Sequence, residues 1–112
     1  MDTRTKIVPR QEAEARLHNR EGRWVTGQFD PLLAEHVQWL EKARKSGQIL
    51  VVEVTNPKHP LLAQRARAEL VAALSMVDLV VLGGRAAGPS DADVTERFVE
   101  HVLRRHQQES PR

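Results

Sequence analysis

The residues best suited to chemistry lie together between positions 25 and 40, in the stretch VTGQFDPLLAEHVQWL. A glycine, a carboxylate and a histidine follow one another here as Gly27, Asp30 and His36. Glycine lets a ligand approach the backbone closely, and the N–H groups at the start of a helix favour anions. The stretch is therefore the candidate site, and an anionic group is the kind of ligand that such a turn favours.

The spacing of these residues resembles a known signature. Gly27, Phe29, Asp30 and His36 are in register with the G-x-F-D-x-x-H-x-G-H motif of the cytidylyltransferase-like nucleotidyltransferases. Within that family, the chain is most similar to the adenylyltransferases that act on heptose 1-phosphate. The resemblance covers about residues 6–83 and stops beyond residue 84.

The resemblance implies a reaction and a set of site residues. Such enzymes join a nucleoside triphosphate to a phosphorylated small molecule and release pyrophosphate, so ATP or CTP with Mg²⁺ is the implied cofactor set. His36 is then the catalytic residue. The residues implied for nucleotide binding are Gly27, Gln28, Phe29, Asp30, Lys58 and Arg67.

Two positions depart from the signature. Leu33 replaces its first histidine, and Glu35 replaces its glycine. Losing one such hydrogen-bond donor costs about 3 kcal/mol of transition-state stabilisation. A carboxylate about 4 Å from a phosphate costs about 4 kcal/mol at an effective dielectric constant of about 20, unless Glu35 swings away or recruits Mg²⁺. If both penalties apply in full, they slow the reaction roughly 10⁵-fold.

Two functions stay open at this point. The first is a catalytically impaired nucleotidyltransferase-like protein that binds ATP or CTP at the turn between the first strand and its helix. The second is a non-catalytic interaction or structural module that keeps only the scaffold, with a second copy or another protein as its partner.

Individual residues also have simpler interpretations. His36 fits a half-buried histidine whose hydrogen bonds are satisfied, and Asp30 fits a helix N-cap. Lys58 and His59 fit a solvated loop, although open α/β sheets bind ligands at the carboxyl ends of their strands. Arg67 fits an ion pair with a neighbouring carboxylate.

The elements that must position these residues alternate between helix and strand. Helices are expected at about 10–20, 31–46, 61–76 and 90–107, the last with Ser90 as its cap, and strands at 23–29, 48–55 and 77–82. This alternation predicts a single α/β domain over residues 1–112, a small Rossmann-like three-layer fold with a parallel sheet and helices on both faces.

The resemblance adds a strand order of 3-2-1 to this fold. In the family, strand one is central, whereas here it would lie at an edge with unpaired backbone groups. We therefore expect self-association or the last helix to cover that edge.

Composition excludes several classes of function. The 112 residues include no cysteine, which excludes disulfides and thiolate metal sites. The net charge of +2 is spread along the chain, with two Trp, two Phe and no Tyr, so no nucleic-acid partner is expected. The longest apolar runs have strand length and the N-terminus lacks an apolar leader, so we expect no membrane association and a cytoplasmic location.

Overall fold

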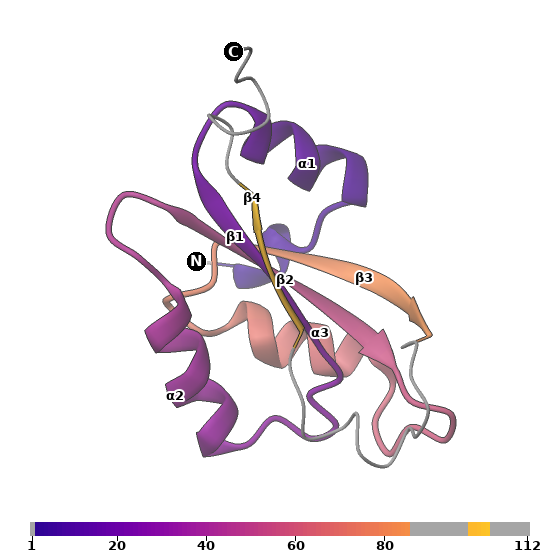
Figure 1. Ribbon diagram of the computed structural model, residues 1–112. Coiled ribbons are helices and arrows are strands. Elements are labelled where there is room, and N and C mark those ends of the chain that lie inside the picture. Colours follow the sequence, from indigo (N-terminus) through magenta and orange to yellow (C-terminus); the bar gives the residue numbers. More distant parts are fainter. Residues whose placement is uncertain (1, 86–98, 104–112) are drawn as a thin grey trace.

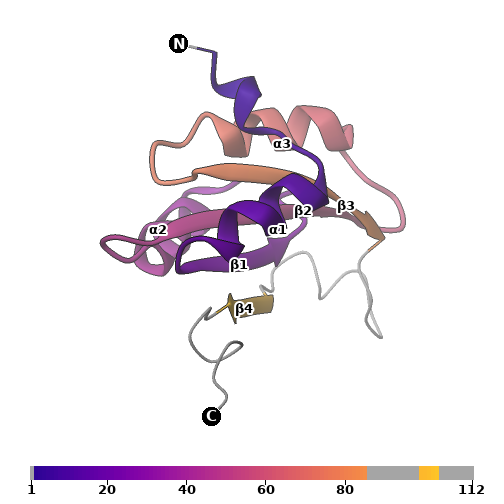
Figure 2. The same ribbon diagram turned by 90° about the horizontal axis from the view of Figure 1, so that it is seen from above.

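A single sheet forms the centre of the computed structural model, which describes residues 2–85 and 99–103, with Arg85 and residues 99–103 as backbone only. Its strand order is β3-β2-β1-β4, as Figure 2 shows from above. Strands β1, β2 and β3 are parallel, and β4 runs antiparallel to β1. The elements in chain order are η1 (Thr3–Lys6), α1 (Arg10–His18), β1 (Gly22–Gly27), α2 (Ala34–Ala43), β2 (Ile49–Asn56), α3 (Gln64–Ala72), β3 (Leu79–Arg85) and β4 (Val99–Leu103).

Helices cover both faces of the sheet (Figure 1). Helices α2 and α3 connect β1 to β2 and β2 to β3, two steps in the same direction, so right-handed crossovers place both on one face. Before α1, Ile7 forms a parallel bridge to Val80 on the far side of β3. The chain then returns across the sheet to β1, and this reversed direction places α1 on the other face. The predicted parallel α/β layer fold is confirmed.

The central strand β2 is buried on both faces, as its continuous apolar run predicts. Leu50, Val52 and Val54 pack into the core beneath α2 and α3. Ile49 and Val51 face α1, whose Ala13 and Leu17 complete a second core with Trp24. Successive residues of β2 therefore point alternately into the two cores, one on each face of the sheet.

The helices begin later than the sequence predicts. Helix α2 starts at Ala34 rather than at 31, and α3 starts at Gln64 rather than at 61. The delay at α3 has a physical cause, because the backbone N–H groups of Leu61 and Leu62 donate to the carboxylate of Asp30. That contact holds the segment before α3 in a non-helical path.

The predicted C-terminal helix is wrong over the residues that can be compared. Val99–Leu103 form β4 and pair with β1, from Val99 opposite Thr26 to Leu103 opposite Gly22. The exposed backbone of β1 offers five residues a partner for hydrogen bonding, which outweighs a helical pattern in the sequence. The expected cap at Ser90 and the remainder of 90–107 lie outside the described residues.

The edge of β1 is accordingly covered in a way that the sequence did not predict. Strand β4 of the same chain occupies it, and the sheet has four strands among the described residues rather than three.

Within the part of the chain that the structure describes, no helix is long and apolar enough to cross a membrane.

The close approach of α1 to the sheet gives a first prediction. A Cβ atom on Gly22 would lie 2.3 Å from Cδ2 of Leu17 and 2.7 Å from the carbonyl oxygen of Ile49, whereas one on Gly84 would meet nothing within 4 Å. We expect Gly22→Ala to lower the free energy of unfolding by about 1–3 kcal/mol. Gly84→Ala should change it by no more than about 1 kcal/mol. Urea unfolding of both variants checks this, and equal effects would contradict the packing described.

Candidate functional site

The turn that follows β1 carries the candidate site. Gly27 ends the strand opposite Val54 of β2, and the next residues leave the sheet at its carboxyl end. Phe29 has a φ angle of 51°, in the left-handed region, and its side chain is fully buried in the core beneath α2 and α3. This conformation costs about 1–2 kcal/mol for a residue other than glycine. Burial of the aromatic ring offsets that cost, so Phe29 anchors the turn.

Asp30 joins this turn to the segment that precedes α3. Its side chain is buried, and its two carboxylate oxygens accept hydrogen bonds from the backbone N–H groups of Leu61 at 2.7 Å and Leu62 at 2.9 Å. The expected helix N-cap is therefore wrong, because the N-cap residues of α2 and α3 are Leu33 and Ala63, and Asp30 instead binds backbone N–H groups of the loop before α3.

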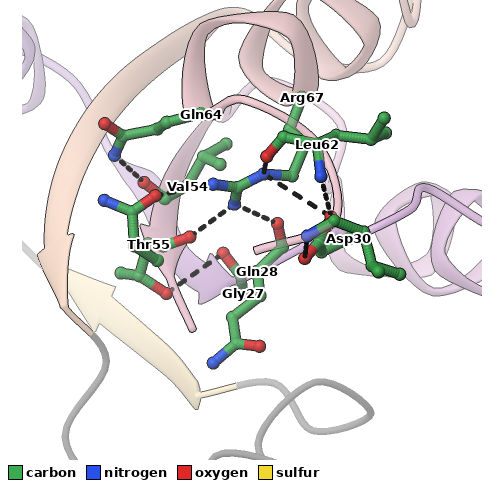
Figure 3. A network of polar contacts seen from close by, with 10 residues as sticks. Gly27, Gln28, Asp30, Val54, Thr55, Leu62, Gln64 and Arg67 are labelled. Carbon is green, nitrogen blue, oxygen red and sulfur yellow. Dashed lines mark hydrogen bonds and ion pairs between the residues drawn. The ribbon is translucent and has the colours of Figure 1, made fainter. Parts of the chain in front are cut away.

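Arg67 lies behind Asp30 and has no exposed surface. Its guanidinium donates to the carbonyl oxygens of Gln28 at 2.9 Å, Thr55 at 2.7 Å and Leu62 at 2.9 Å. It also donates to Oδ1 of Asn56 at 2.6 Å. Figure 3 shows the guanidinium between the ends of β1 and β2. Arg67 thus links the turn after β1, the end of β2 and the segment before α3.

The charge of Arg67 has a partner in this interior position. Its Nε atom lies 3.9 Å from Oδ1 of Asp30, in an ion pair between two buried side chains. Burial lowers the pKa of Arg67 from its ordinary value, and the carboxylate of Asp30 opposes that shift. The predicted pairing with a neighbouring carboxylate is confirmed. With its nitrogen atoms engaged inside the protein, Arg67 can position a ligand site but does not reach a ligand from this position.

His36 is buried in the first turn of α2. Its Nδ1 atom accepts a hydrogen bond from the backbone N–H of Leu33 at 2.9 Å, which is the half of a capping box that the third helical residue supplies. Because Nδ1 is the acceptor, the neutral ring carries its proton at Nε2. The ring also packs edge-on against Phe29, with centroids 5.4 Å apart. His36 therefore has a structural role, and its contact with a phosphate stays a prediction.

The two residues that depart from the signature lie on the surface at the same place. Leu33 is the N-cap residue of α2 and is 38% exposed, and Glu35 is an exposed residue in the first turn. A carboxylate in a first helical turn is stabilised by the helix dipole. The same charge opposes a phosphate that approaches this helix terminus.

The loop between β2 and α3 borders the turn. Lys58 and His59 are exposed in it, at the carboxyl end of the sheet where they were expected. The structure thus brings the predicted residues of β1, α2 and this loop to one end of the sheet. Their roles in nucleotide binding stay predictions.

Three polar residues that the sequence did not single out support the site. The side-chain amide of Gln64 donates to the carbonyl oxygen of Val54 (Figure 3) and also to that of Gly83, so it joins the ends of β2 and β3. The hydroxyl of Thr55 donates to the carbonyl oxygen of Gly27, and Asn56 accepts from Arg67. Their only signal in the sequence is position, since they end β2 or begin α3.

The same end of the sheet offers few acidic ligands. Among residues 2–85 and 99–103, no group of three or more His, Cys, Asp or Glu side chains could hold a metal ion. Both oxygens of Asp30 accept backbone N–H groups, whereas Glu35 is exposed.

Comparison with known proteins gives partial similarities, and no family model matches the chain. A bifunctional protein HldE of Magnetococcus marinus is 43% identical over 68 residues, which are 53% of this chain and 14% of that protein. One from Helicobacter pylori strain P12 is 33% identical over 89 residues, or 71% of this chain and 19% of the relative. An FAD synthase of Methanothrix thermoacetophila is 44% identical over 65 residues, or 53% of this chain and 46% of that enzyme.

The predicted resemblance to nucleotidyltransferases is confirmed as a partial similarity. These partial homologues are cytidylyltransferase-like nucleotidyltransferases, and each match spans less than half the length of the relative.

The burial of Arg67 gives a second prediction. Replacing it by methionine leaves buried carbonyl oxygens without a donor and the buried Asp30 carboxylate without its counter-charge, so we expect Arg67→Met to lower the free energy of unfolding by about 3–5 kcal/mol. Arg65 is the matched control, because it lies on the same helix in an exposed ion pair with Glu69. Arg65→Met should cost less than about 1 kcal/mol. Urea unfolding measures both, and similar losses would show that Arg67 links nothing essential.

Proposed function

We propose that the chain binds a nucleoside triphosphate, ATP or CTP with Mg²⁺, at the carboxyl ends of β1 and β2, and that it transfers the nucleotidyl group poorly or not at all. The observation that carries this proposal is the rigid turn from Gly27 to Asp30. It is held by Asp30 and Arg67, in a chain with partial similarity to nucleotidyltransferases.

The binding groups in this proposal are mainly backbone atoms. The turn at Gly27 and Gln28 and the N–H groups that begin α2 form the phosphate-binding part, where the helix dipole favours anions. Lys58 and His59 supply side chains from the facing loop. His36 lies in the first turn of α2, and the resemblance implies that its side chain contacts a phosphate there. Asp30, Phe29 and Arg67 act as positioning residues.

Poor transfer follows from the side chains at the start of α2. Leu33 has no hydrogen-bond donor to stabilise charge on the phosphoryl group, and Glu35 adds a negative charge beside it. An exposed Glu35 could instead hold Mg²⁺ against the phosphates, and it would then favour nucleotide binding. The heptose-type acceptor suggested by the resemblance is left open in this proposal.

One observation favours a second candidate function. Leu33 is 38% exposed at the position where the signature has a histidine, and Leu61 and Leu62 are exposed in the loop before α3. A surface that has exchanged a polar group for an apolar one suits a protein contact. The second candidate is therefore an interaction module that keeps the scaffold without the nucleotide.

Thermal unfolding with and without Mg²⁺ and ATP or CTP tests the proposal. A ligand at about 100 times its dissociation constant adds about 2.7 kcal/mol, and for a domain of this size we expect a rise in Tm of about 10 °C. Glu35→Gln should increase the rise, because it removes the charge that opposes the phosphates. Glu41→Gln is the control, since Glu41 is exposed on the same helix but six residues farther along, and it should respond like the unchanged protein.

Two outcomes would separate the candidates. A rise in Tm only in Glu35→Gln would identify Glu35 as the block to nucleotide binding. The absence of any rise in all three proteins would reject the nucleotide proposal and favour the interaction module.

A further inference from the structure

The outer edge of β3 is open over part of its length. Strand β3 lies at one end of the strand order, opposite β4 (Figure 2). The N-terminal segment covers the start of this edge, because Ile7 forms a parallel bridge to Val80 and the backbone N–H of Val8 donates to the Val80 carbonyl oxygen at 2.9 Å. Pro9 follows and has no backbone N–H with which to extend the pairing, and the chain then leaves the edge as α1.

Leu82 is the next residue of β3 whose backbone faces this edge. The polar groups of a strand point alternately to its two sides, and those of Val80 point outward, so the N–H and C=O groups of Leu82 point outward as well. Among residues 2–85 and 99–103, no strand pairs with Leu82 on that side. An unpaired edge of this kind is a template to which another extended chain adds by backbone hydrogen bonds.

A hollow of about 310 Å³ lies beside this open backbone. Its lining combines apolar residues of the N-terminal segment and β3 with one arginine from each of two helices, namely Ile7, Val8, Pro9, Arg10, Arg65, Val81 and Leu82. Val81 is buried on the α1 side of the sheet, and Leu82 is 40% exposed. The volume is near the lower end of the range of about 300–1,000 Å³ for ligand sites, and the apolar floor suits an aliphatic side chain.

Two positive charges line the hollow, and no carboxylate among the described residues does. Arg10 is the first residue of α1, and Arg65 lies in the first turn of α3. Their side chains are 49% and 56% exposed, and each forms an ion pair through one nitrogen atom, Arg10 with Glu53 and Arg65 with Glu69. Because a guanidinium has five N–H donors, both arginines keep donors for a further carboxylate.

We propose that an extended peptide of a partner protein, with an aliphatic residue next to an acidic one, adds to the sheet beside Leu82. Its backbone pairs with the outward N–H and C=O groups of Leu82, its aliphatic side chain fills the hollow, and its carboxylate meets Arg65. A second copy of this chain does not suit the edge, because a two-fold axis would bring the arginines of both copies to one interface. The lining shares no residue with the proposed nucleotide site, so the contact does not depend on nucleotide binding.

A blocked hexapeptide of alternating valine and glutamate residues is the probe, added to the isotopically labelled, nucleotide-free protein. We expect the amide signals of Leu82 and Val8 to shift in NMR spectra and to saturate with peptide concentration. Replacing the glutamates of the probe by lysines should raise its dissociation constant at least about tenfold. Methylating the backbone nitrogens of its two central residues should have a similar effect, because it removes one donor whichever edge of the peptide faces β3.

Charge reversal on the protein gives the matched comparison. Arg65→Glu should weaken binding of the glutamate peptide at least about tenfold and should favour the lysine peptide instead. Arg16→Glu is the control, because Arg16 forms the same kind of exposed ion pair on α1, with Glu12, but does not line the hollow. Leu82→Asp should also weaken the glutamate peptide, whereas Leu70→Asp, at an exposed position of α3 outside the hollow, should not. Circular dichroism checks that each variant is folded.

Three results would overturn the proposal. They are no shift of the Leu82 amide signal with the glutamate peptide at millimolar concentration, equal losses in Arg65→Glu and Arg16→Glu, and an unchanged affinity of the backbone-methylated peptide. Hexanoate is a further probe, because it has an aliphatic body and a carboxylate but no peptide backbone. If hexanoate binds as tightly as the peptide, the hollow takes a small amphipathic anion and the added strand is rejected.

Discussion

The buried guanidinium of Arg67 is the constraint on which the rest of the site depends. A charge without exposed surface is tolerated only where its hydrogen bonds are satisfied, and here the acceptors come from Gln28, from the end of β2 and from Leu62. The side chain therefore fixes where β1 ends, where β2 ends and where α3 begins. Asp30 completes the arrangement by neutralising the charge and capping the segment before α3.

This arrangement changes the interpretation of the sequence signature. Its aspartate and phenylalanine, Asp30 and Phe29, suggest ligand contacts when only their spacing is known. In the structure, one caps a loop and the other fills the core. His36 likewise has a structural contact, because its Nδ1 atom accepts the backbone N–H of Leu33 at the start of α2. The signature thus describes a scaffold as much as a reaction, which explains how it can persist while Leu33 and Glu35 depart from it.

The fold could be predicted largely from the sequence, because the strands are short apolar runs and the helices between them carry one apolar face. The boundaries of the elements could not be predicted in the same way. Helix α3 starts late because Asp30 binds Leu61 and Leu62, which lie about thirty positions away in the sequence. Val99–Leu103 shows a similar limit. Its pattern suits a helix, but pairing with the open edge of β1 decides its conformation. The interior position of Arg67 was also hidden, because an arginine in a polar helix pattern gives no sign of burial.

Amide hydrogen exchange at Leu61 and Leu62 tests the central claim most directly. Both residues lie in a loop next to Pro60, where amide groups ordinarily exchange rapidly with solvent. If Asp30 and Arg67 hold this segment, its amide groups should be protected to nearly the same degree as those of β2. Arg67→Lys should then abolish that protection while the β2 amide groups stay protected. Exchange of the Leu61 and Leu62 amides at the rate of an unstructured peptide, in the unchanged and folded protein, would contradict the account.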